Sequence, residues 1–200
     1  MLQPVGAQGY PLVNRDAAIR SLDSQLAQAV WPQLVELDRT CYKELGIGYS
    51  HVMWGREEFL RDFPGKWHLS CIAFDNGGEV TGFWIASQRD NSVVHTHRVA
   101  VSAQSRRQGV GLQMFWYAEA ASAACGAILM TLTVQAANEV AVRFYGGLGF
   151  LAPTPAECLA FAEDHQKRCR PQEGIIVEPG ELEYRLFVRH LEGTKSSHRG

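Results

Sequence analysis

The chain has 200 residues, a formal net charge of −2 and 46% apolar residues. This length suits one domain with a sizeable core, and a chain without a basic excess is unlike a nucleic-acid-binding protein. No apolar run approaches the roughly 18 residues of a membrane span, so we expect neither nucleic acid nor a membrane as a partner.

The cysteines indicate a reducing compartment. There are five of them, an odd number, and no CxxC pair occurs, which is typical of free thiols rather than of a disulfide framework. The first residues show no basic segment followed by an apolar run, so no secretory signal is expected. We therefore predict a cytoplasmic protein.

Pro32 dominates the prediction for the first third of the chain. Proline is tolerated in the first turn of a helix but not in its interior, so a helix over 32–44 is expected after a break near Val30. A second helix over 54–63 is expected to end before Pro64. The other elements expected here are a loose arm over 1–16, a strand over 17–22 and a turn over 46–49.

The middle of the chain is predicted to form an antiparallel meander. Three segments, 68–74, 79–87 and 92–101, are rich in β-branched and aromatic residues and are separated by turn-forming residues. Residues 75–78, Asp-Asn-Gly-Gly, predict a hairpin turn. We expect three successive strands, each paired with the next.

The rest of the chain predicts alternating helices and strands. A helix over 109–125 is expected to stop at Gly126, and the apolar segment 128–134 predicts a central strand. Asn138 is expected to cap a helix over 138–145. The remaining expected elements are a short strand over 149–151, an insertion over 153–180 with a helix-like run over 157–168, a final strand over 181–190 and a disordered tail over 193–200.

The predicted order of elements, β-α-α-β-β-β-α-β-α-β-β, indicates an α/β fold. Neighbouring strands of a meander are antiparallel, whereas parallel strands are joined by a crossover such as a helix. We therefore expect one domain over 17–192, built on a mixed, mostly antiparallel sheet flanked by helices.

Residues 93–111, VVHTHRVAVSAQSRRQGVG, combine two chemical features. In a regular strand the alternate residues from Val93 to Val101, which include His95 and His97, would share one face. The glycine-rich turn that follows opens a helix, whose free backbone N–H groups suit an anion such as phosphate. No metal site is expected, because no third ligand accompanies the two histidines.

The chain resembles the GCN5-related N-acetyltransferases, the GNAT family, in two motifs. The first is Arg106-x-x-Gly109-x-Gly111 after a strand, similar to the family's acetyl-CoA motif of Arg or Gln, x, x, Gly, x, Gly or Ala. The second is Asn138 followed by the block FYGGLGF at 144–150. A glycine-rich turn alone is a weak signal, but both motifs together, in order, are specific. The resemblance does not include the predicted insertion.

The resemblance implies acetyl-CoA as cofactor and CoA as product. Backbone amides of the turn would hold the pyrophosphate, and the strand before it would pair with the pantetheine arm. For the arginine side chains a solvated surface turn is the alternative, and for Asn138 a plain helix cap. The cofactor-binding residues that the resemblance implies are Val99, Ala100, Val101, Arg106, Arg107, Gln108, Gly109, Val110, Gly111, Leu112, Asn138 and Tyr145.

The resemblance also implies an acid and a base. Tyr145 matches the family's general acid, which would donate to the departing thiolate; a core tyrosine is the alternative. Only a neutral amine attacks, and an alkylamine is neutral in only about one molecule in 10³ at pH 7, so an imidazole base is useful. His95 is preferred to His97 as the base, because it stands where many members carry a glutamate. The spacing of the two histidines is similar to that in serotonin N-acetyltransferase. Polar packing of these histidines is the alternative.

We expect the acyl group to pass to a primary amine of a small molecule by direct attack in a ternary complex. A protein lysine or N-terminus is the alternative acceptor, and a non-catalytic acyl-CoA-binding regulatory module is the alternative of another class. Tyr49 and Trp54 are the candidates for acceptor binding. The sequence leaves open the acceptor's identity, the acyl length and a homodimeric state.

Overall fold

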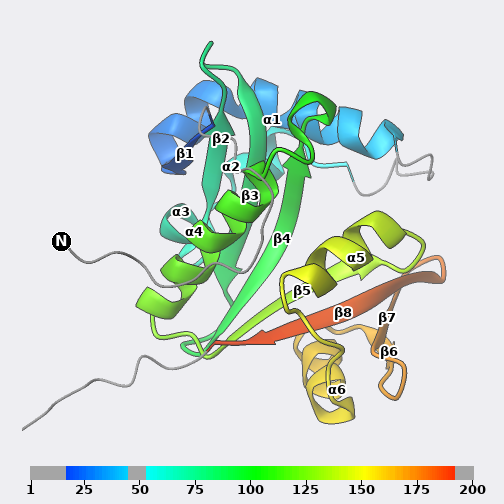
Figure 1. Cartoon of the computed structure of the whole chain (residues 1–200). Coiled ribbons are helices and arrows are strands. Elements are labelled where there is room, and N and C mark those ends of the chain that lie inside the picture. The colour runs from blue at the N-terminus through cyan, green and yellow to red at the C-terminus, as the bar shows by residue number, and fades with distance from the viewer. Residues whose placement is uncertain (1–16, 45–52, 192–200) are drawn as a thin grey trace, which may run out of the picture.

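The computed structural model describes residues 17–44 and 53–191, so the predicted arm, the turn over 46–49 and the tail lie outside it. The strands are β1 (Ala18–Ser21), β2 (Cys71–Phe74), β3 (Val80–Gln88), β4 (Val93–Val101), β5 (Leu129–Gln135), β6 (Arg168–Arg170), β7 (Ile175–Glu178) and β8 (Leu182–His190). The helices are α1 (Ser24–Glu44), α2 (Arg56–Leu60), α3 (Lys66–Leu69), α4 (Val110–Ala124), α5 (Glu139–Gly147) and α6 (Pro155–Asp164). The strands form one sheet in the order β1-β2-β3-β4-β5-β8-β7-β6 (Figure 1). This mixed, mostly antiparallel sheet confirms the predicted fold class.

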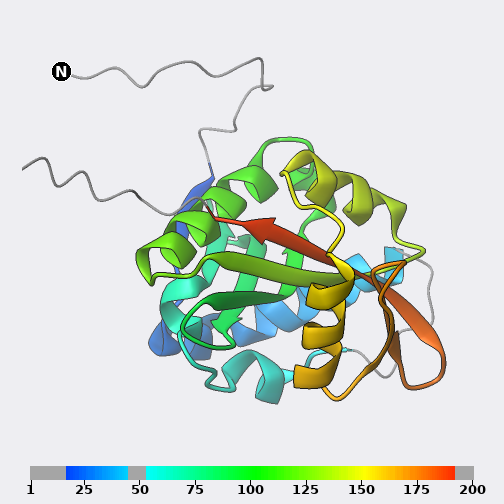
Figure 2. The same ribbon diagram turned by 90° about the horizontal axis from the view of Figure 1, so that it is seen from below.

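Helices cover both faces of the sheet (Figure 2). α4 and α5 lie on one face, while α1, α2 and α6 lie on the other. The α4 layer is packed around Trp84 and Met114, and the α1 layer around Leu34 and Phe83. All four side chains are fully buried, and burial of such a side chain contributes about 1.5–3 kcal/mol, so hydrophobic packing holds both layers to the sheet.

α1 is one unbroken helix, so the predicted break near Val30 is wrong. Pro32 removes one backbone donor and leaves the carbonyl of Gln28 without its helical partner. Gln28 and Pro32 are both exposed, so water can satisfy that carbonyl. The buried face of α1 continues on both sides of Pro32, and this packing keeps the helix intact.

The connection from α1 to the sheet differs most from its prediction. α2 is much shorter than the helix predicted over 54–63, because the backbone leaves the helical conformation and becomes extended at Arg61 (ψ 131°). α3 includes the first two residues of the strand predicted over 68–74, which begins only at Cys71. The buried ammonium of Lys66 donates to the carbonyl oxygen of Phe59 at 2.7 Å and to that of Arg61 at 2.6 Å. These two hydrogen bonds hold the carbonyl groups at the end of α2, so the helix does not have to continue to satisfy them.

The helix caps next to α4 and α5 agree with the prediction. α4 ends before Gly126, whose φ is 84°, and Asn138 caps α5 with its side chain. The strand predicted over 149–151 is wrong, since Leu151 forms only an isolated bridge with Val188.

The segment 153–180 adds a helix and two strands that extend the sheet. α6 begins earlier than the predicted helix, behind a capping box in which Thr154 and Glu157 each bond the other's backbone N–H. β7 pairs with β8, and β6 pairs with β7. Neither strand is predicted by the sequence, and an insertion relative to the family stays a prediction.

The parallel strands β4 and β5 separate partway along their length. They pair only between Val93–Thr96 and Leu129–Leu132, while β4 continues beside β3 and β5 continues beside β8. Figure 1 shows the two strands diverging as a V. β5 is central, as predicted, and the divergence opens the sheet at its middle.

A β-bulge in β4 lies at this divergence. Thr96 is paired with Ala86 of β3 and Arg98 with Ile85, so His97 is the additional residue. A bulge leaves one residue outside the ladder and bends the strand. β4 therefore turns away from β5 at the point where His97 stands.

The bulge also changes which β4 side chains share a face. The sequence predicts a common face for the alternate residues from Val93 to Val101, on the condition that the strand is regular. Val99 and Val101 pack in the α4 layer, whereas His97 stacks on Phe63, with ring centroids 5.1 Å apart, and lies beside the α1 layer. One strand thus presents valines to one layer and histidines to the other.

Candidate active site

The loop between β4 and α4 has the backbone shape of an anion cradle. The N-cap of α4 is Gly109, in the left-handed conformation with φ 83°, and Arg107 also has a positive φ of 60°. Such a φ is costly for a residue with a side chain and often marks a functional loop. The N-terminus of this 15-residue helix carries a partial positive charge. The backbone N–H groups of 108–112 therefore suit a phosphate group.

Arg106 ties this loop to the end of α1. Its Nε donates to the carbonyl oxygen of Val101 at 3.0 Å, and its Nη2 lies 2.5 Å from Glu44 Oε2 and 3.4 Å from Cys41 Sγ. Arg106 and Arg107 are both exposed. Because these contacts hold the Arg106 guanidinium, they support a role in positioning the loop.

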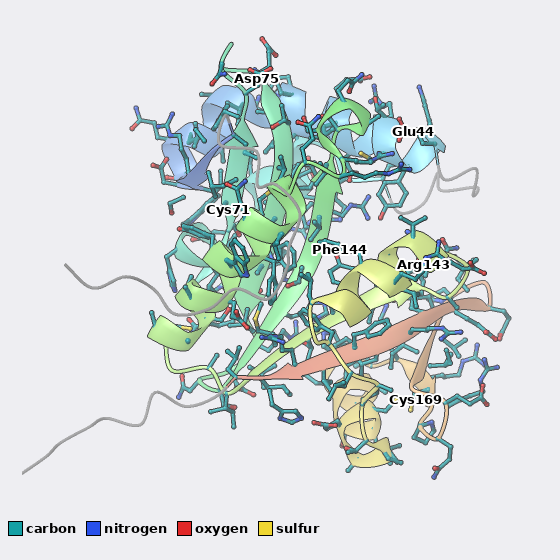
Figure 3. All side chains as sticks on the ribbon, viewed as in Figure 1. Glu44, Cys71, Asp75, Arg143, Phe144 and Cys169 are labelled. Atoms are coloured by element: carbon teal, nitrogen blue, oxygen red, sulfur yellow. The ribbon has the colours of Figure 1, made fainter. Side chains whose placement is uncertain are left out.

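Close packing of α4 on α5 explains the glycine at position 111. A Cβ atom on Gly111 would lie 3.1 Å from Cζ of Phe144. Figure 3 labels Phe144 on α5 next to Arg143, whose side chain is largely exposed. Gly111 therefore lets the two sequence motifs meet.

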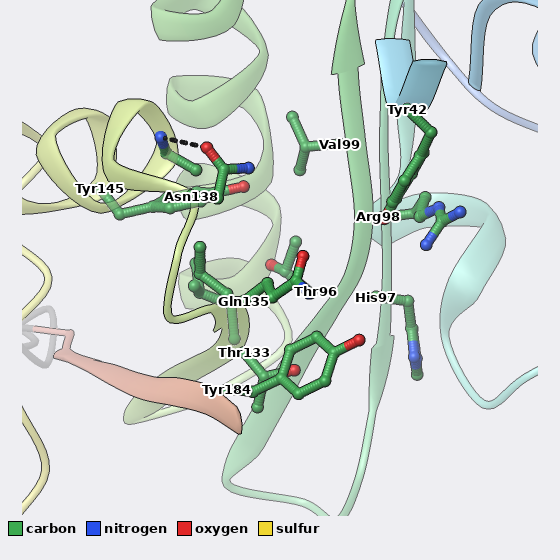
Figure 4. A pocket seen from close by; sticks show the side chains of 13 residues that line it. Tyr42, Thr96, His97, Arg98, Val99, Thr133, Gln135, Asn138, Tyr145 and Tyr184 are labelled. Atoms are coloured by element: carbon green, nitrogen blue, oxygen red, sulfur yellow. Dashed lines mark hydrogen bonds between the residues drawn. The ribbon is translucent and has the colours of Figure 1, made fainter. Parts of the chain in front are cut away.

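A cleft occupies the opening between β4 and β5 (Figure 4). It has a volume of about 600 Å³, part of it open to solvent. Four of the predicted site residues line it, namely His97, Val99, Asn138 and Tyr145. The cleft brings the predicted acid and one predicted base to the same space.

Tyr145 enters the cleft from α5. It is 8% exposed and packs edge to face against Trp84 and Phe150, with ring centroids 6.2 and 5.7 Å away. Burial raises the pKa of the Tyr145 phenol well above its usual value. The hydroxyl therefore stays protonated and is a hydrogen-bond donor at neutral pH.

Asn138 combines the two roles that the sequence left as alternatives. Its Oδ1 accepts a hydrogen bond from the backbone N–H of Ala141 at 3.1 Å and caps α5. The same side chain lines the cleft above Tyr145 (Figure 4). The cap fixes the side chain in place, and the amide nitrogen can serve as a donor at the cleft.

The two predicted histidines occupy different positions. Their ring centroids are 4.9 Å apart, but only His97 lines the cleft; its Nε2 lies 2.7 Å from Ser87 Oγ. His95 is 7% exposed, and its Nδ1 lies 3.0 Å from Thr131 Oγ1. The geometry thus favours His97, rather than His95, as the group that reaches a bound ligand.

Both imidazoles are neutral at pH 7. Burial lowers the pKa of His97 to about 4, with the charges of Arg89 and His165 acting in the same direction. Burial, followed by the neighbouring His97, lowers the pKa of His95 well below its usual value. A neutral imidazole can accept a proton, so His97 has the correct state for a base.

The protein is expected to lose stability as the pH falls from 6.5 toward 4. In this window the unfolded chain protonates its histidines, whereas buried His97, with a pKa of about 4, stays neutral. The unfolded state then binds more protons and is favoured. His97→Gln should remove about 2 kcal/mol of this loss at pH 4.5, measured by urea denaturation at pH 7.0 and 4.5. The exposed His68→Gln is the control, and an equal acid loss in both variants would contradict the prediction.

The α1 side of the cleft holds residues that sequence reasoning did not assign to the site. Arg98 makes a bidentate ion pair with Asp38, at 2.8 Å for both Nε–Oδ1 and Nη2–Oδ2. Tyr42 stacks 4.0 Å from the guanidinium carbon, and Tyr184 reaches the cleft from β8. A charge within the apolar strand VVHTHRVAV was the available signal for Arg98. Tyr184 gives no such signal, since its place depends on the pairing of β8 with β5.

Of the two residues predicted to bind the acceptor, the structure describes one. Trp54 lies behind the cleft wall, with its ring centroid 6.4 Å from that of His97 and 5.6 Å from the guanidinium carbon of Arg98. It does not itself line the cleft. Tyr49 lies outside the described residues.

Two features are absent from the part of the chain that the structure describes. Among the residues described, no group of three His, Cys, Asp or Glu side chains could hold a metal ion. Over the same residues, no helix has both the length and the apolar character needed to cross a membrane.

Comparisons with known proteins agree on one family. The chain matches the model of the Acetyltransferase (GNAT) family over residues 31–150. The fold is similar to that of the ribosomal-protein-S18-alanine N-acetyltransferase of Escherichia coli, at 16% identity and TM-score 0.62 over 90% of this chain and 97% of the other. It is also similar to a GNAT acetyltransferase of Staphylococcus aureus Mu50 (15%, 0.64, 88% and 99%) and to the PaiA N-acetyltransferase of Thermoplasma acidophilum in complex with coenzyme A (17%, 0.61, 87% and 98%). No curated protein matches the chain.

Proposed function

Because the chain belongs to the GNAT family of acetyltransferases, which use acetyl-CoA, we propose that it acetylates a primary amine of a small molecule by direct attack in a ternary complex. The observation that carries this proposal is the cleft through the sheet, where Tyr145 and His97 line opposite sides. Among the described residues, none of the side chains that line the cleft is a cysteine, so the proposal uses direct attack rather than an acyl-enzyme.

The site fits acetyl-CoA, which supplies an acyl group activated as a thioester. The backbone of 108–112 would hold the pyrophosphate. The edge of β4 beyond its pairing with β5 would bond the pantetheine arm as an added strand does. Within that edge Val99 is best placed, because the carbonyl of Ala100 approaches β3 and that of Val101 accepts from Arg106.

Tyr145 acts in this proposal as a hydrogen-bond donor to the departing sulfur. A thiol has a pKa near 8.5 and a tyrosine near 10, so full proton transfer is uphill by about 2 kcal/mol. Burial raises the pKa of Tyr145 further. Stabilisation of the developing negative charge on sulfur by the O–H group is therefore its main contribution.

His97 acts as the base that takes the amine proton. For Nδ1 to accept this proton, Nε2 must carry a hydrogen and donate it to Ser87 Oγ, which lies 2.7 Å away. Phe63 stacks on the ring and holds its plane. Because the pKa of His97 is about 4, the imidazole is neutral above pH 5 but is too weak a base to deprotonate an alkylammonium, whose pKa is near 10.4. His97 therefore takes the proton after attack, when the nitrogen is bonded to the acyl carbon and has become acidic.

The proposed class of acceptor is argued from the side chains that line the cleft. Tyr42 and Tyr184 narrow it on the side away from Tyr145, which favours a compact amine. A protein lysine or N-terminus is the second candidate, because the Escherichia coli structural relative is named for acetylation of a ribosomal protein. A cytoplasmic location, supported by five free cysteines, and a single domain over 17–192 stay predictions.

The deciding experiment is thiol release from acetyl-CoA in the presence of a panel of small amines and of peptides with free N-termini or lysines. Turnover with small amines and little with peptides supports the proposal, whereas the reverse supports a protein acceptor. Clear acetyl-CoA binding with no release in any arm would support the non-catalytic acyl-CoA-binding module instead.

Gly109→Ala is expected to weaken acetyl-CoA binding about 10-fold and to cost about 1 kcal/mol of stability. The added methyl group is strained at φ 83° and displaces the amides of the cradle. Gly126→Ala is the matched control, since its φ of 84° lies at the other end of α4. Titration calorimetry measures the Kd, and equal values for both variants would argue against the cradle.

A further inference from the structure

Arg189 of β8 connects the two helices that carry the proposed reaction. We propose that Arg189, held by Glu119, is a positioning residue, which fixes α5, and with it the hydroxyl of Tyr145, relative to the anion cradle at the start of α4. This inference rests on the proposed function and adds to it a residue that does not line the cleft. It is carried by the hydrogen bonds of Arg189, by the turn that ends α5 and by the glycine at position 149.

The guanidinium of Arg189 binds two other elements at once. Its Nε donates to Glu119 Oε1 on α4 at 2.6 Å, and its Nη1 donates to the carbonyl oxygen of Leu148 at 2.7 Å. Leu148 is the C-cap of α5. The guanidinium carbon also lies 5.2 Å from the ring centroid of Phe115 on α4. Because a guanidinium is planar and its N–H groups have fixed directions, this one side chain sets the arrangement of β8, α4 and the end of α5.

The turn that ends α5 transmits this contact to Tyr145. The backbone carbonyl of Tyr145 accepts hydrogen bonds from the N–H groups of Leu148 and Phe150, both at 3.1 Å. The ring of Phe150 also packs on the ring of Tyr145, with centroids 5.7 Å apart. The carbonyl that Arg189 holds lies within this same turn. A shift of the turn would therefore move both the backbone of Tyr145 and the ring that supports its side chain.

Gly149 provides the space for the guanidinium. Its φ is 81°, a conformation that favours glycine, and a Cβ atom at this position would overlap Nη1 of Arg189. The residue belongs to the block FYGGLGF at 144–150, which also contains Tyr145. One glycine of the motif thus lets an arginine from β8 reach the end of α5.

Tyr145 and the cofactor are held by different helices in the proposed function. The backbone at the start of α4 holds the pyrophosphate, whereas the hydroxyl on α5 donates to the departing sulfur. Such a donor acts only within about 2.7–3.1 Å of the atom on which charge develops, and a misplacement of about 1 Å can cost about 100-fold in rate. Apolar packing has no preferred direction, so the rings around Tyr145 restrict sliding of α5 less than the bonds to Arg189 do.

The first test is the effect of Arg189→Met on turnover and on cofactor binding. The variant keeps the apolar stem and removes the bonds to Glu119 and Leu148. With the fastest acceptor of the amine and peptide panel, we expect kcat to fall about 10-fold. The Kd for acetyl-CoA, measured by titration calorimetry, should change by less than about threefold, because the backbone of the cradle is untouched.

Two further variants frame this result. Arg189→Lys keeps the charge but cannot reach Glu119 and Leu148 with one planar fork, so its kcat should lie between those of Arg189→Met and the original protein. Arg143→Met is the control, because it removes an arginine of α5 whose ion pair with Glu139 is exposed. Its kcat should stay within about twofold of the original value.

A double-mutant cycle tests whether Arg189 acts through the hydroxyl of Tyr145. In Tyr145→Phe there is no hydroxyl to position, so adding Arg189→Met should lower kcat by less than about a further twofold. A residue that acts only through general stability would lower kcat by the same factor in both backgrounds. Urea denaturation verifies that each variant is folded at the assay temperature, and Arg189→Lys replaces Arg189→Met in the cycle if the latter does not fold.

The outcomes separate this inference from the proposed function. An unchanged kcat in Arg189→Met, or the same loss of kcat with and without the Tyr145 hydroxyl, overturns the role of Arg189 and leaves the acetyltransferase standing. A loss that consists mainly of weaker acetyl-CoA binding overturns it as well. Full turnover in Tyr145→Phe overturns this inference together with the role of Tyr145, and acetyl-CoA binding with no acetylation of any acceptor overturns both the inference and the proposed function.

Discussion

Replacing Tyr145 with phenylalanine is expected to lower kcat about 100-fold or more and to change the Kd for acetyl-CoA by less than about threefold. The substitution removes the donor hydroxyl and keeps the ring that packs on Trp84 and Phe150, so the fold should not change. Because burial raises the pKa of Tyr145, the loss should be constant between pH 6 and 9. Steady-state thiol release gives kcat, and calorimetry gives the Kd.

Tyr117→Phe is the matched control for this experiment. Its half-buried side chain packs in the α4 layer, its hydroxyl donates to the carbonyl oxygen of His68 at 3.4 Å, and it does not line the cleft. Turnover should match that of the original protein. If Tyr145→Phe instead raised the Kd strongly and left kcat unchanged, Tyr145 would be a cofactor-binding residue rather than a catalytic one.

Asp38→Ala is expected to cost about 3–5 kcal/mol of unfolding free energy. The variant leaves the guanidinium of Arg98, which is 9% exposed, without the carboxylate that pairs it within the fold. It also opens a small void beneath α1. This loss is a large fraction of the usual 5–15 kcal/mol, and urea denaturation would show it as a lower midpoint.

A double variant separates charge from packing in this pair. Arg98→Met combined with Asp38→Leu should recover most of the stability, because an apolar pair of similar volume can replace a buried ion pair. Glu36→Ala on the same helix removes an exposed pair with Arg39 and should change stability by less than about 1 kcal/mol. A cost for Asp38→Ala as small as that of Glu36→Ala would show that water reaches Arg98.

Local chemistry made part of the fold predictable from sequence. The glycines on either side of α4 set its ends by backbone geometry, and Asn138 caps α5 with its side chain; the structure places both as expected. Pro32 misled the prediction, since its effect depends on whether the carbonyl of Gln28 is solvated, which sequence does not show. The short β6 and β7 were missed because β7 becomes a strand by pairing with β8, and β6 by pairing with β7.

The residues of the cleft also divide into those that local sequence predicts and those that depend on the arrangement of the strands. Residues within the two motifs were identified because the spacing of each motif is local in the chain. Tyr42, Arg98 and Tyr184 come from three separate elements, α1, β4 and β8, and they meet only because β4 and β5 separate. The choice of His97 over His95 depends on a bulge, which the alternation of residues alone cannot reveal.

The bulge in β4 affects how the sequence of this strand can change in evolution. If His97 were deleted, Thr96 would still face the α4 layer, Arg98 the α1 layer and Val99 the α4 layer, because a bulge sets two residues against one. His97 is therefore an insertion into an otherwise regular strand, and the residues that build the core keep their faces without it. The faces of the core residues and the proposed base therefore depend on separate positions of β4, so loss of His97 alone would remove the proposed base and leave the core alternation intact.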